Sequence, residues 1–337
     1  MSLVYYHPIA IKNKHPFQKV INPLISVMDR TTRHWPDYDY ENLFPMPALV
    51  GTRNFNDLSV ERIKELTKGT KQIKLLWSGG IDSTYIACLM IDLGIMDSLL
   101  AEGRLTIGLN ADSIKENPVF FERFLKKYLS VIVQSDVVLK NPGENETIIT
   151  GEMADNLVGS LTMKSCVDYY NDFAVVREPW KDRPMAWLSR NLEGAEKTAL
   201  YDFIEETVAN SPVELPTGHD LFWYLNFNFK WQAVNFRIVS HAVNEDVGNR
   251  LIKNLAHFFN TDDFQQWSLA EGHHFSGDGW GDYKSVMKKY IYMVNGDTEY
   301  FKYKTKFPSL PALLRYKDTF DFIYKDGDRY HFTKQEI

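Results

Sequence analysis

The stretch IKLLWSGGIDSTYIACLM, residues 73–90, joins two apolar segments through a pair of glycines. Residues 73–77 are short, apolar and bounded by polar residues, which is the pattern of a buried strand. From Asp82 onward the apolar residues recur at helical spacing, and Gly94 suits the end of that helix. The sequence therefore predicts a strand, a glycine turn and a helix in direct succession.

The turn itself has the chemistry of an anion site. Gly79 and Gly80 let the backbone approach a ligand, and the unpaired amides at the helix start point at an anion such as phosphate. Ser78 and Ser83 would add hydroxyl donors. Asp82 is a poor direct partner for phosphate but suits a magnesium ion that bridges phosphate oxygens. An ordinary strand-to-helix turn is the structural alternative.

A second segment, ETIITGEMADNLVGSL at residues 146–161, repeats this logic. A β-branched strand leads into Gly151, and the acidic residues Glu152 and Asp155 lie three apart on one helix face. Taken alone, these carboxylates are equally well explained by their favourable interaction with the positive end of a helix dipole. Together with Asp82, they predict a pair of strand ends that holds magnesium on a pyrophosphate.

Strands and helices alternate through the first half of the chain. The residue patterns predict helices over 59–69 and 117–129 and strands over 104–111 and 130–134. This order predicts an α/β fold, a parallel sheet flanked by helices with ligands at the carboxyl ends of the strands. The part after residue 165 reads as mostly helical, and its aromatic stretch, residues 219–236, indicates core packing.

These motifs resemble a known superfamily. Residues 78–83, Ser-Gly-Gly-Ile-Asp-Ser, are similar to the PP-loop of the ATP pyrophosphatases, and no lysine follows the glycines as it would in kinases and GTPases. Residues 151–160 resemble the G-E-G-A-D-E-L-F-G-G stretch of the synthetase domain of asparagine synthetases, which β-lactam synthetases share. Weaker similarity continues in residues 231–249, 258–267 and 299–315. The resemblance implies an adenine nucleotide alpha hydrolase-like (HUP/PP-loop) fold.

The same resemblance implies a division of the chain. Residues 1–58 would form an irregular N-terminal arm and residues 318–337 a C-terminal tail. Between them, residues 59–317 would form the synthetase-like domain, with a nucleotide-binding core over 70–165 and a helical acceptor-side part over 166–317.

Site residues carry over position by position. The resemblance implies that ATP is bound at the glycine turn and two neighbouring strand ends, by Ser78, Gly79, Gly80, Asp82, Ser83, Gly108, Leu109 and Gly151. Asp82 and Asp155 would hold Mg²⁺, and Glu152 would lie near the pyrophosphate or the incoming amine. A late lysine, Lys304 first and Lys306 next, would stabilise charge on the α-phosphate in the transition state.

The implied activity is that of an AMP-forming carbon–nitrogen ligase, which adenylates a carboxylate and then transfers it to an amine. The glutaminase domain of asparagine synthetases needs an N-terminal cysteine, whereas this sequence has Ser2 and only residues 1–77 ahead of the turn. Ammonia, another amine or a separate ammonia-supplying partner would therefore provide the nitrogen. Met153, Asn156 and Ser160 depart from the family pattern. The alternatives are a PP-loop enzyme that modifies a nucleobase and a nucleotide-binding module that has lost turnover.

Composition restricts the partners. The net charge is −6 and no long basic run occurs, and both observations argue against a nucleic-acid substrate. The basic segment 284–290 reads as a solvated helix face. Two cysteines, Cys88 and Cys166, are too few for a disulfide framework, and no apolar run approaches 18 residues. The expectation is a cytoplasmic protein with no membrane segment and small-molecule substrates.

Overall fold

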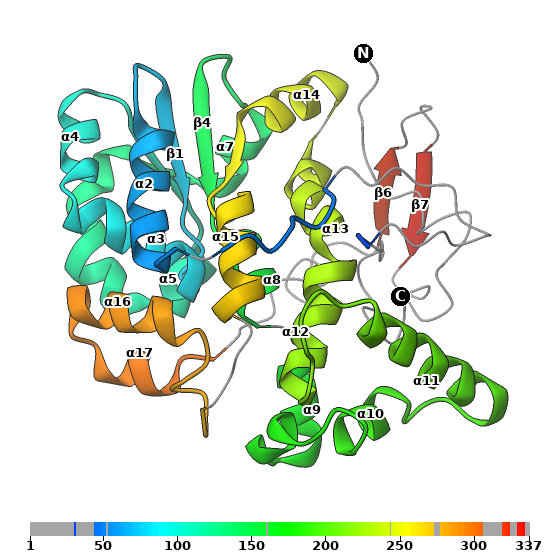
Figure 1. The fold of residues 1–337 in the computed structure, drawn as a ribbon. Helices are drawn as coiled ribbons and strands as arrows, with labels where there is room; N and C mark the ends of the chain where they lie inside the picture. The colour runs from blue at the N-terminus through cyan, green and yellow to red at the C-terminus, as the bar shows by residue number, and fades with distance from the viewer. Residues whose placement is uncertain are drawn as a thin grey trace.

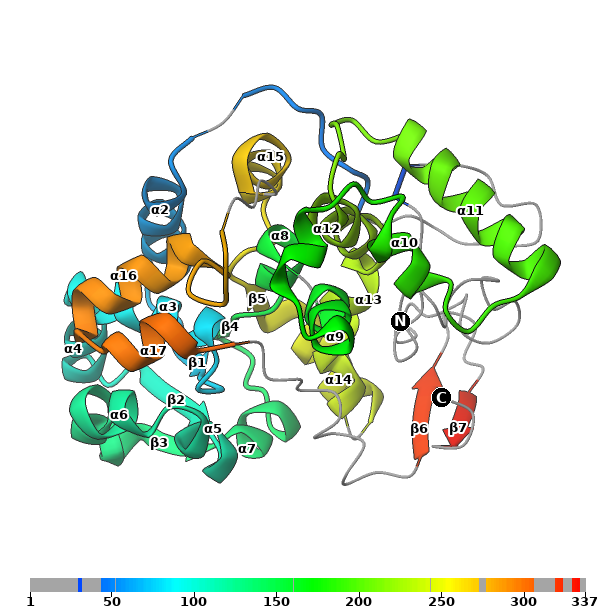
Figure 2. The same ribbon diagram turned by 90° about the horizontal axis from the view of Figure 1, so that it is seen from below.

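A central parallel sheet organises the molecule. The computed structural model describes residues 30–31, 44–51, 53–159, 161–242, 244–272, 277–305, 319–323 and 329–333. Within them, five parallel strands lie in the order β3-β2-β1-β4-β5, with helices on both faces of the sheet (Figures 1 and 2). The strands are β1 (Gln72–Leu76), β2 (Leu105–Leu109), β3 (Ile132–Gln134), β4 (Glu146–Thr150) and β5 (Leu255–His257). The predicted α/β fold with a parallel sheet is confirmed.

The predicted strand, turn and helix around the two glycines form the centre of this sheet. β1 runs into α3 (Ile81–Asp92), which is buried along nearly its whole length. Gly94, in the left-handed conformation at φ 68°, separates α3 from α4 (Ile95–Ala101). α3 packs against α2 (Phe55–Thr67) and α16 (Ser285–Asn295) on one side of the sheet (Figure 2).

The other side of the sheet is covered by α7 (Ser135–Lys140) and α14 (Glu245–Asn254). Ile148 of β4 packs in this smaller apolar cluster, while its neighbour Ile149 packs in the main core. Successive strand side chains point to opposite faces, so β4 is apolar on both and buried throughout.

The connection between β2 and β3 differs from the prediction. In place of one helix over 117–129, the chain forms α5 (Ala111–Glu116), a short α6 (Pro118–Phe120), a π-helical turn η1 (Phe121–Leu125) and a 3₁₀ turn η2 (Lys126–Val131). The side chain of Asn117 accepts a hydrogen bond from the Phe120 amide, and Pro118 begins the new turn. A cap residue followed by proline restarts the helix here.

A helical part follows β4. Its elements are α8 (Ala154–Val158), α9 (Leu161–Tyr170), η3 (Phe173–Arg177), α10 (Arg183–Leu188), α11 (Gly194–Ala209), α12 (Gly218–Phe229), α13 (Trp231–Phe236) and η4 (Ile238–His241). Every residue of α12 is buried, which confirms the predicted core role of that aromatic stretch. β5 then returns to the sheet from inside the region 166–317. The sheet therefore extends beyond the predicted core boundary at residue 165.

The last described elements follow β5, and among them α16 packs on α3. They are α15 (Asp262–Trp267), η5 (Ser268–Gly272), α16, α17 (Thr298–Tyr303) and an antiparallel pair, β6 (Thr319–Ile323) with β7 (Arg329–Thr333), which lies in the predicted tail. Among the described residues no single helix has the length and apolar composition of a membrane span. Only α3 and α4 together, bent by 73°, meet that test.

Arg30 joins the predicted N-terminal arm to the helical part. Its guanidinium is buried and donates to the carbonyl oxygens of Phe44, Pro45 and Phe227 and to the Gln265 side chain. The group also lies 4.5 Å from the centre of the Trp231 ring. The described residues of the arm are thus fixed to α12, α13 and α15.

Candidate functional site

The sheet order brings the two predicted motifs together. β1 and β4 are neighbours, and parallel strands end at the same edge of the sheet. Gly151, just after β4, lies against the start of α3: a Cβ at this position would be 2.9 Å from the Ser83 amide nitrogen and 3.0 Å from Asp82 Cβ. Only glycine permits this approach. The predicted nucleotide-binding residues of both strand ends therefore share one site.

The loop between β1 and α3, residues 77–80, is here called the glycine loop. Gly79 has φ 79°, and a Cβ there would lie 2.2 Å from the carbonyl oxygen of Ser113. The Ser78 amide donates to Ser83 Oγ at 3.0 Å, and the two serine hydroxyls are also 3.0 Å apart. Ser78 and Ser83 thus fix the conformation of the loop, which leads directly into the first turn of α3.

Two carboxylates meet one ammonium at the mouth of the glycine loop. Lys284 Nζ lies 2.5 Å from an Asp82 oxygen and 2.6 Å from an Asp155 oxygen. The structure therefore brings together the two predicted magnesium ligands. Burial opposes the charge of Lys284, but Asp82 and Tyr283 more than offset it, so the pKa of the Lys284 ammonium is above its ordinary value.

Lys284 was missed by sequence reasoning, and the prediction that residues 284–290 form a solvated face is wrong. Lys284 and Lys288 are both buried, whereas Lys289 is exposed. Lys288 donates to the Trp280 carbonyl, and burial lowers its pKa to about 8. The available signal was the spacing: both lysines fall on the stripe of Met287 and Ile291 that packs against the core.

The two predicted late lysines have different outcomes. Lys304, just after α17, lies 2.8 Å from the Glu116 carboxylate. Glu116 in turn borders the glycine loop, since a Cβ at Gly79 would be 2.9 Å from Glu116 Cβ. Lys304 therefore lies beside the loop, as its predicted role requires. Lys306 lies outside the described residues.

Glu152 is held on the other side of the site. Its carboxylate pairs with Arg237, which follows α13, and both side chains are about four-fifths buried. Its amide donates to Thr150 Oγ1 at 3.3 Å. Thr150 pairs in turn with His257 Nδ1 across β4 and β5, and His257 Nε2 lies 2.7 Å from the Asn235 carbonyl.

Gly108 has a packing role in this structure. A Cβ there would be 2.7 Å from a Leu76 methyl group, and its carbonyl accepts a hydrogen bond from the Trp77 amide at 2.8 Å. Leu109, at the end of β2, is buried. The predicted contact of their backbone with adenine stays a prediction.

Two of the three residues that depart from the resembled pattern, Met153 and Asn156, lie at or in α8. Met153 is buried with φ 76° and precedes α8. Asn156 donates to the Asn226 carbonyl at 3.1 Å, and Asn226 donates to the Asp155 carbonyl at 2.7 Å. Asn156 and Asn226 thus lock α8, and with it Asp155, against α12. Ser160 lies outside the described residues.

The donor set suits a magnesium ion that arrives with a nucleotide. Magnesium is usually bound by one or two carboxylates together with substrate phosphates. In this structure Asp82 and Asp155 converge on a single cation, the Lys284 ammonium. Among the described residues no three His, Cys, Asp or Glu side chains gather around one point. The carboxylate pair therefore fits a metal whose remaining ligands come from phosphate and water.

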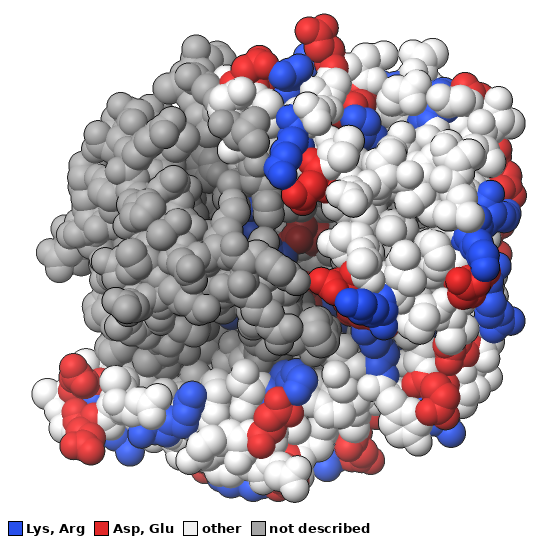
Figure 3. All heavy atoms as spheres, turned by 180° about the vertical axis from the view of Figure 1, so that it is seen from behind, with Lys and Arg blue, Asp and Glu red and all other residues white. Residues whose placement is uncertain are grey.

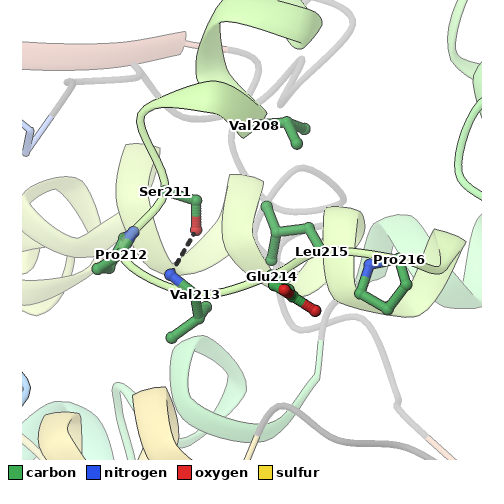
Figure 4. Close-up of a pocket in the computed structure, with 7 residues that line it drawn as sticks. All are labelled: Val208, Ser211, Pro212, Val213, Glu214, Leu215 and Pro216. Atoms are coloured by element: carbon green, nitrogen blue, oxygen red, sulfur yellow. Dashed lines mark hydrogen bonds between the residues drawn. The ribbon is translucent and has the colours of Figure 1, made fainter.

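One face of the molecule carries both signs of charge (Figure 3). Figure 3 shows lysine and arginine interleaved with aspartate and glutamate over the described part of one face, without a broad patch of either sign. A separate hollow, lined by Val208 and residues 211–216, lies at the connection between α11 and α12 (Figure 4). Its lining is mostly apolar, and the Ser211 hydroxyl there accepts from the Val213 amide. Its lining includes the Glu214 carboxylate but no lysine or arginine.

Neither a scan against protein-family models nor a search of curated proteins found a match to this chain.

Proposed function

We propose that this protein is an ATP-dependent, AMP-forming ligase with a PP-loop nucleotide site, which activates a carboxylate and joins it to an amine. The observation that carries the proposal is the meeting of Asp82 and Asp155, from two adjacent strand ends, on one cation position at the mouth of the glycine loop. This arrangement supports binding of a magnesium–polyphosphate rather than of a neutral ligand. The HUP/PP-loop fold is part of the proposal.

In this mechanism the amides of Gly79 and of the first turn of α3 bind phosphate oxygens, since the amides of Trp77, Ser78 and Gly80 already donate within the protein. Asp82 and Asp155 would hold magnesium, which supplies positive charge to the leaving pyrophosphate. An oxygen of the substrate carboxylate attacks the α-phosphorus, and the bond from that phosphorus to the oxygen of the β-phosphate breaks. Pyrophosphate leaves, and the acid is now a mixed anhydride with AMP.

The second step forms the amide. The amine attacks the acyl carbon, AMP leaves with the bonding electron pair, and the nitrogen loses a proton. Lys284 and Lys304 would stabilise charge on the phosphates as it builds up, because both ammonium groups border the loop. Glu152, held by Arg237, lies on the acceptor side and would orient the amine.

Product analysis tests this function directly. The protein is incubated with magnesium, ammonium, a pool of carboxylic acids, and ATP labelled at the α and γ phosphates. We expect AMP and pyrophosphate, and a loss of at least about 100-fold in Asp82→Asn. Asp92→Asn, at the far end of the same helix, should leave the rate unchanged.

Two outcomes would contradict the proposed ligase. Formation of ADP and phosphate would exclude attack at the α-phosphorus. Tight binding of ATP without cleavage under every acceptor pool would favour the nucleotide-binding module instead. The interleaved surface charge of Figure 3 gives no support to a nucleobase substrate within a nucleic acid.

A further inference from the structure

Glu116, the last residue of α5, places a carboxylate beside the glycine loop. A Cβ at Gly79 would lie 2.9 Å from Glu116 Cβ, and a Cβ at Gly80 would lie 3.5 Å from Glu116 Oε1. Negative charge is unfavourable at this position for two reasons. It repels an incoming phosphate, and it lies at the end of a helix where the dipole is also negative. The presence of this carboxylate therefore needs an explanation.

The compensating charge comes from Lys304, which lies 188 residues further along the chain. Its Nζ is 2.8 Å from the same Oε1 atom of Glu116 and 3.5 Å from the carbonyl oxygen of that residue. Both side chains are less than one-fifth exposed. An ammonium group has three donors, and within the described part of the chain Nζ makes only these two contacts, the second of them long. At least one donor therefore stays available for a ligand.

Glu116 fixes the position of the Lys304 ammonium relative to the glycine loop. One carboxylate oxygen contacts the ammonium and also borders Gly80, the residue that precedes α3. A lysine side chain loses much rotamer freedom when it binds a ligand, and a partner that orients it beforehand reduces that loss. The carboxylate can therefore assist anion binding through the lysine, although its own charge opposes it.

We propose that Glu116 is a positioning residue, which orients the Lys304 ammonium beside the glycine loop, where that ammonium donates to the phosphates of the bound nucleotide. This inference rests on the proposed function and deepens it, because it explains how a lysine so late in the sequence is held at the loop. The alternative is a structural cap, in which Lys304 only neutralises the end of α5. The two explanations predict different results when Lys304 is absent.

The test is calorimetric titration of the full chain with magnesium and α,β-methylene-ATP, an analogue that cannot be cleaved between its α and β phosphates. Lys304→Met should weaken binding about tenfold, because a charged hydrogen bond to phosphate is lost. Glu116→Ala should also weaken binding severalfold, although it removes a negative charge from beside the phosphates. Asp112→Ala, which removes an exposed carboxylate of the same helix, should bind the analogue as the parent does.

The double variant decides between the two explanations. In a protein that already carries Lys304→Met, Glu116→Ala should tighten binding, because no ammonium is left to orient and only the repulsion between carboxylate and phosphate is removed. A structural cap does not produce this reversal of sign. Tighter binding in Glu116→Ala alone, or the same change in both backgrounds, would overturn the proposal. Unchanged binding in Lys304→Met would do so as well.

Glu116→Gln covers the case in which Glu116→Ala does not fold, since glutamine keeps the shape of the side chain beside Gly79. Its neutral amide makes a weaker hydrogen bond to the ammonium, so the same reversal of sign is expected at smaller size. These titrations measure binding alone, and a protein that binds ATP without cleaving it would still show the reversal. Failure of the ligase function is thus distinguishable, whereas absence of analogue binding to the parent would overturn the role of Glu116 too.

Discussion

At the scale of single residues, Lys284 determines the charge of the site. Two carboxylates at 2.5 and 2.6 Å from one ammonium would repel each other strongly if it were removed. Lys284→Ala should therefore lower the free energy of unfolding by about 3–5 kcal/mol, the usual cost of breaking a buried ion pair. Magnesium should restore part of that loss, because the metal can take the place of the ammonium.

Thermal unfolding with and without magnesium measures this effect. We expect the magnesium-dependent rise in unfolding temperature to be larger for Lys284→Ala than for the parent. Lys289→Ala, on the exposed face of the same helix, should behave as the parent does. An equal response to magnesium in all three proteins would show that Asp82 and Asp155 do not form a cation site.

Residue-scale reasoning from sequence found part of this site. Asp82, Gly151 and Asp155 could be predicted because each follows a strand, and parallel strands end at one edge. Lys284 could not be placed by that rule, since it follows a loop and has a left-handed backbone at φ 54°. The stripe that it shares with Met287 and Ile291 indicates burial, but it does not identify the two counter-charges, which lie far away in sequence.

At the scale of elements, the pairing of β4 and β5 carries a pH dependence. Burial lowers the pKa of His257 below its ordinary value of about 6.5, although Glu152 acts in the opposite direction. The unfolded chain therefore binds a proton more readily than the folded one. The contribution of neutral His257 to the free energy of unfolding is fully present above about pH 6.5. It is lost as the pH falls below that value.

Urea unfolding between pH 5 and pH 8 tests this dependence. The decline in unfolding free energy below about pH 6.5 should be shallower in His257→Gln, in which no imidazole can be protonated. An identical pH profile in parent and variant would mean that the pKa of His257 is the same in the folded and the unfolded chain, which would contradict the effect of burial.

Element prediction succeeded where periodicity was strong. β1, β2 and β4 were predicted to within two residues, because their apolar runs are bounded by polar residues or glycine. β5 was missed because it has three residues and continues directly from α14. The single helix predicted over 117–129 is divided into shorter turns in the structure, because local capping by Asn117 competes with helical periodicity.

At the scale of the whole molecule, Arg30 decides whether the N-terminal arm belongs to the fold. Burial lowers the pKa of its guanidinium to about 9, yet carbonyl oxygens and two aromatic rings surround the group. Arg30→Met should lower the free energy of unfolding by about 3 kcal/mol, because several buried carbonyls lose their donor. In limited proteolysis, the Arg30→Met protein should be cleaved near residues 44–51 faster than the parent.

Arg53→Met provides the control, since Arg53 pairs with Glu61 at the surface. Neither its unfolding midpoint nor its digestion rate should change. If Arg30→Met were as stable as the parent, the described part of the arm would be a separable appendage, as the sequence alone suggests. No sequence pattern indicated this anchor, because an arginine that follows Asp29 and precedes Arg33 by three residues looks solvent-exposed.

The distance along the chain between Lys284 and its two carboxylate partners has a consequence for biosynthesis. Lys284 follows Asp82 by 202 residues, whereas the strands that present Asp82 and Asp155 are made much earlier. On the ribosome, both carboxylates therefore emerge before the ammonium that neutralises them has been translated. During that interval a magnesium–nucleotide could stabilise the half-made site, so nucleotide supply would affect the yield of folded chains as well as their activity.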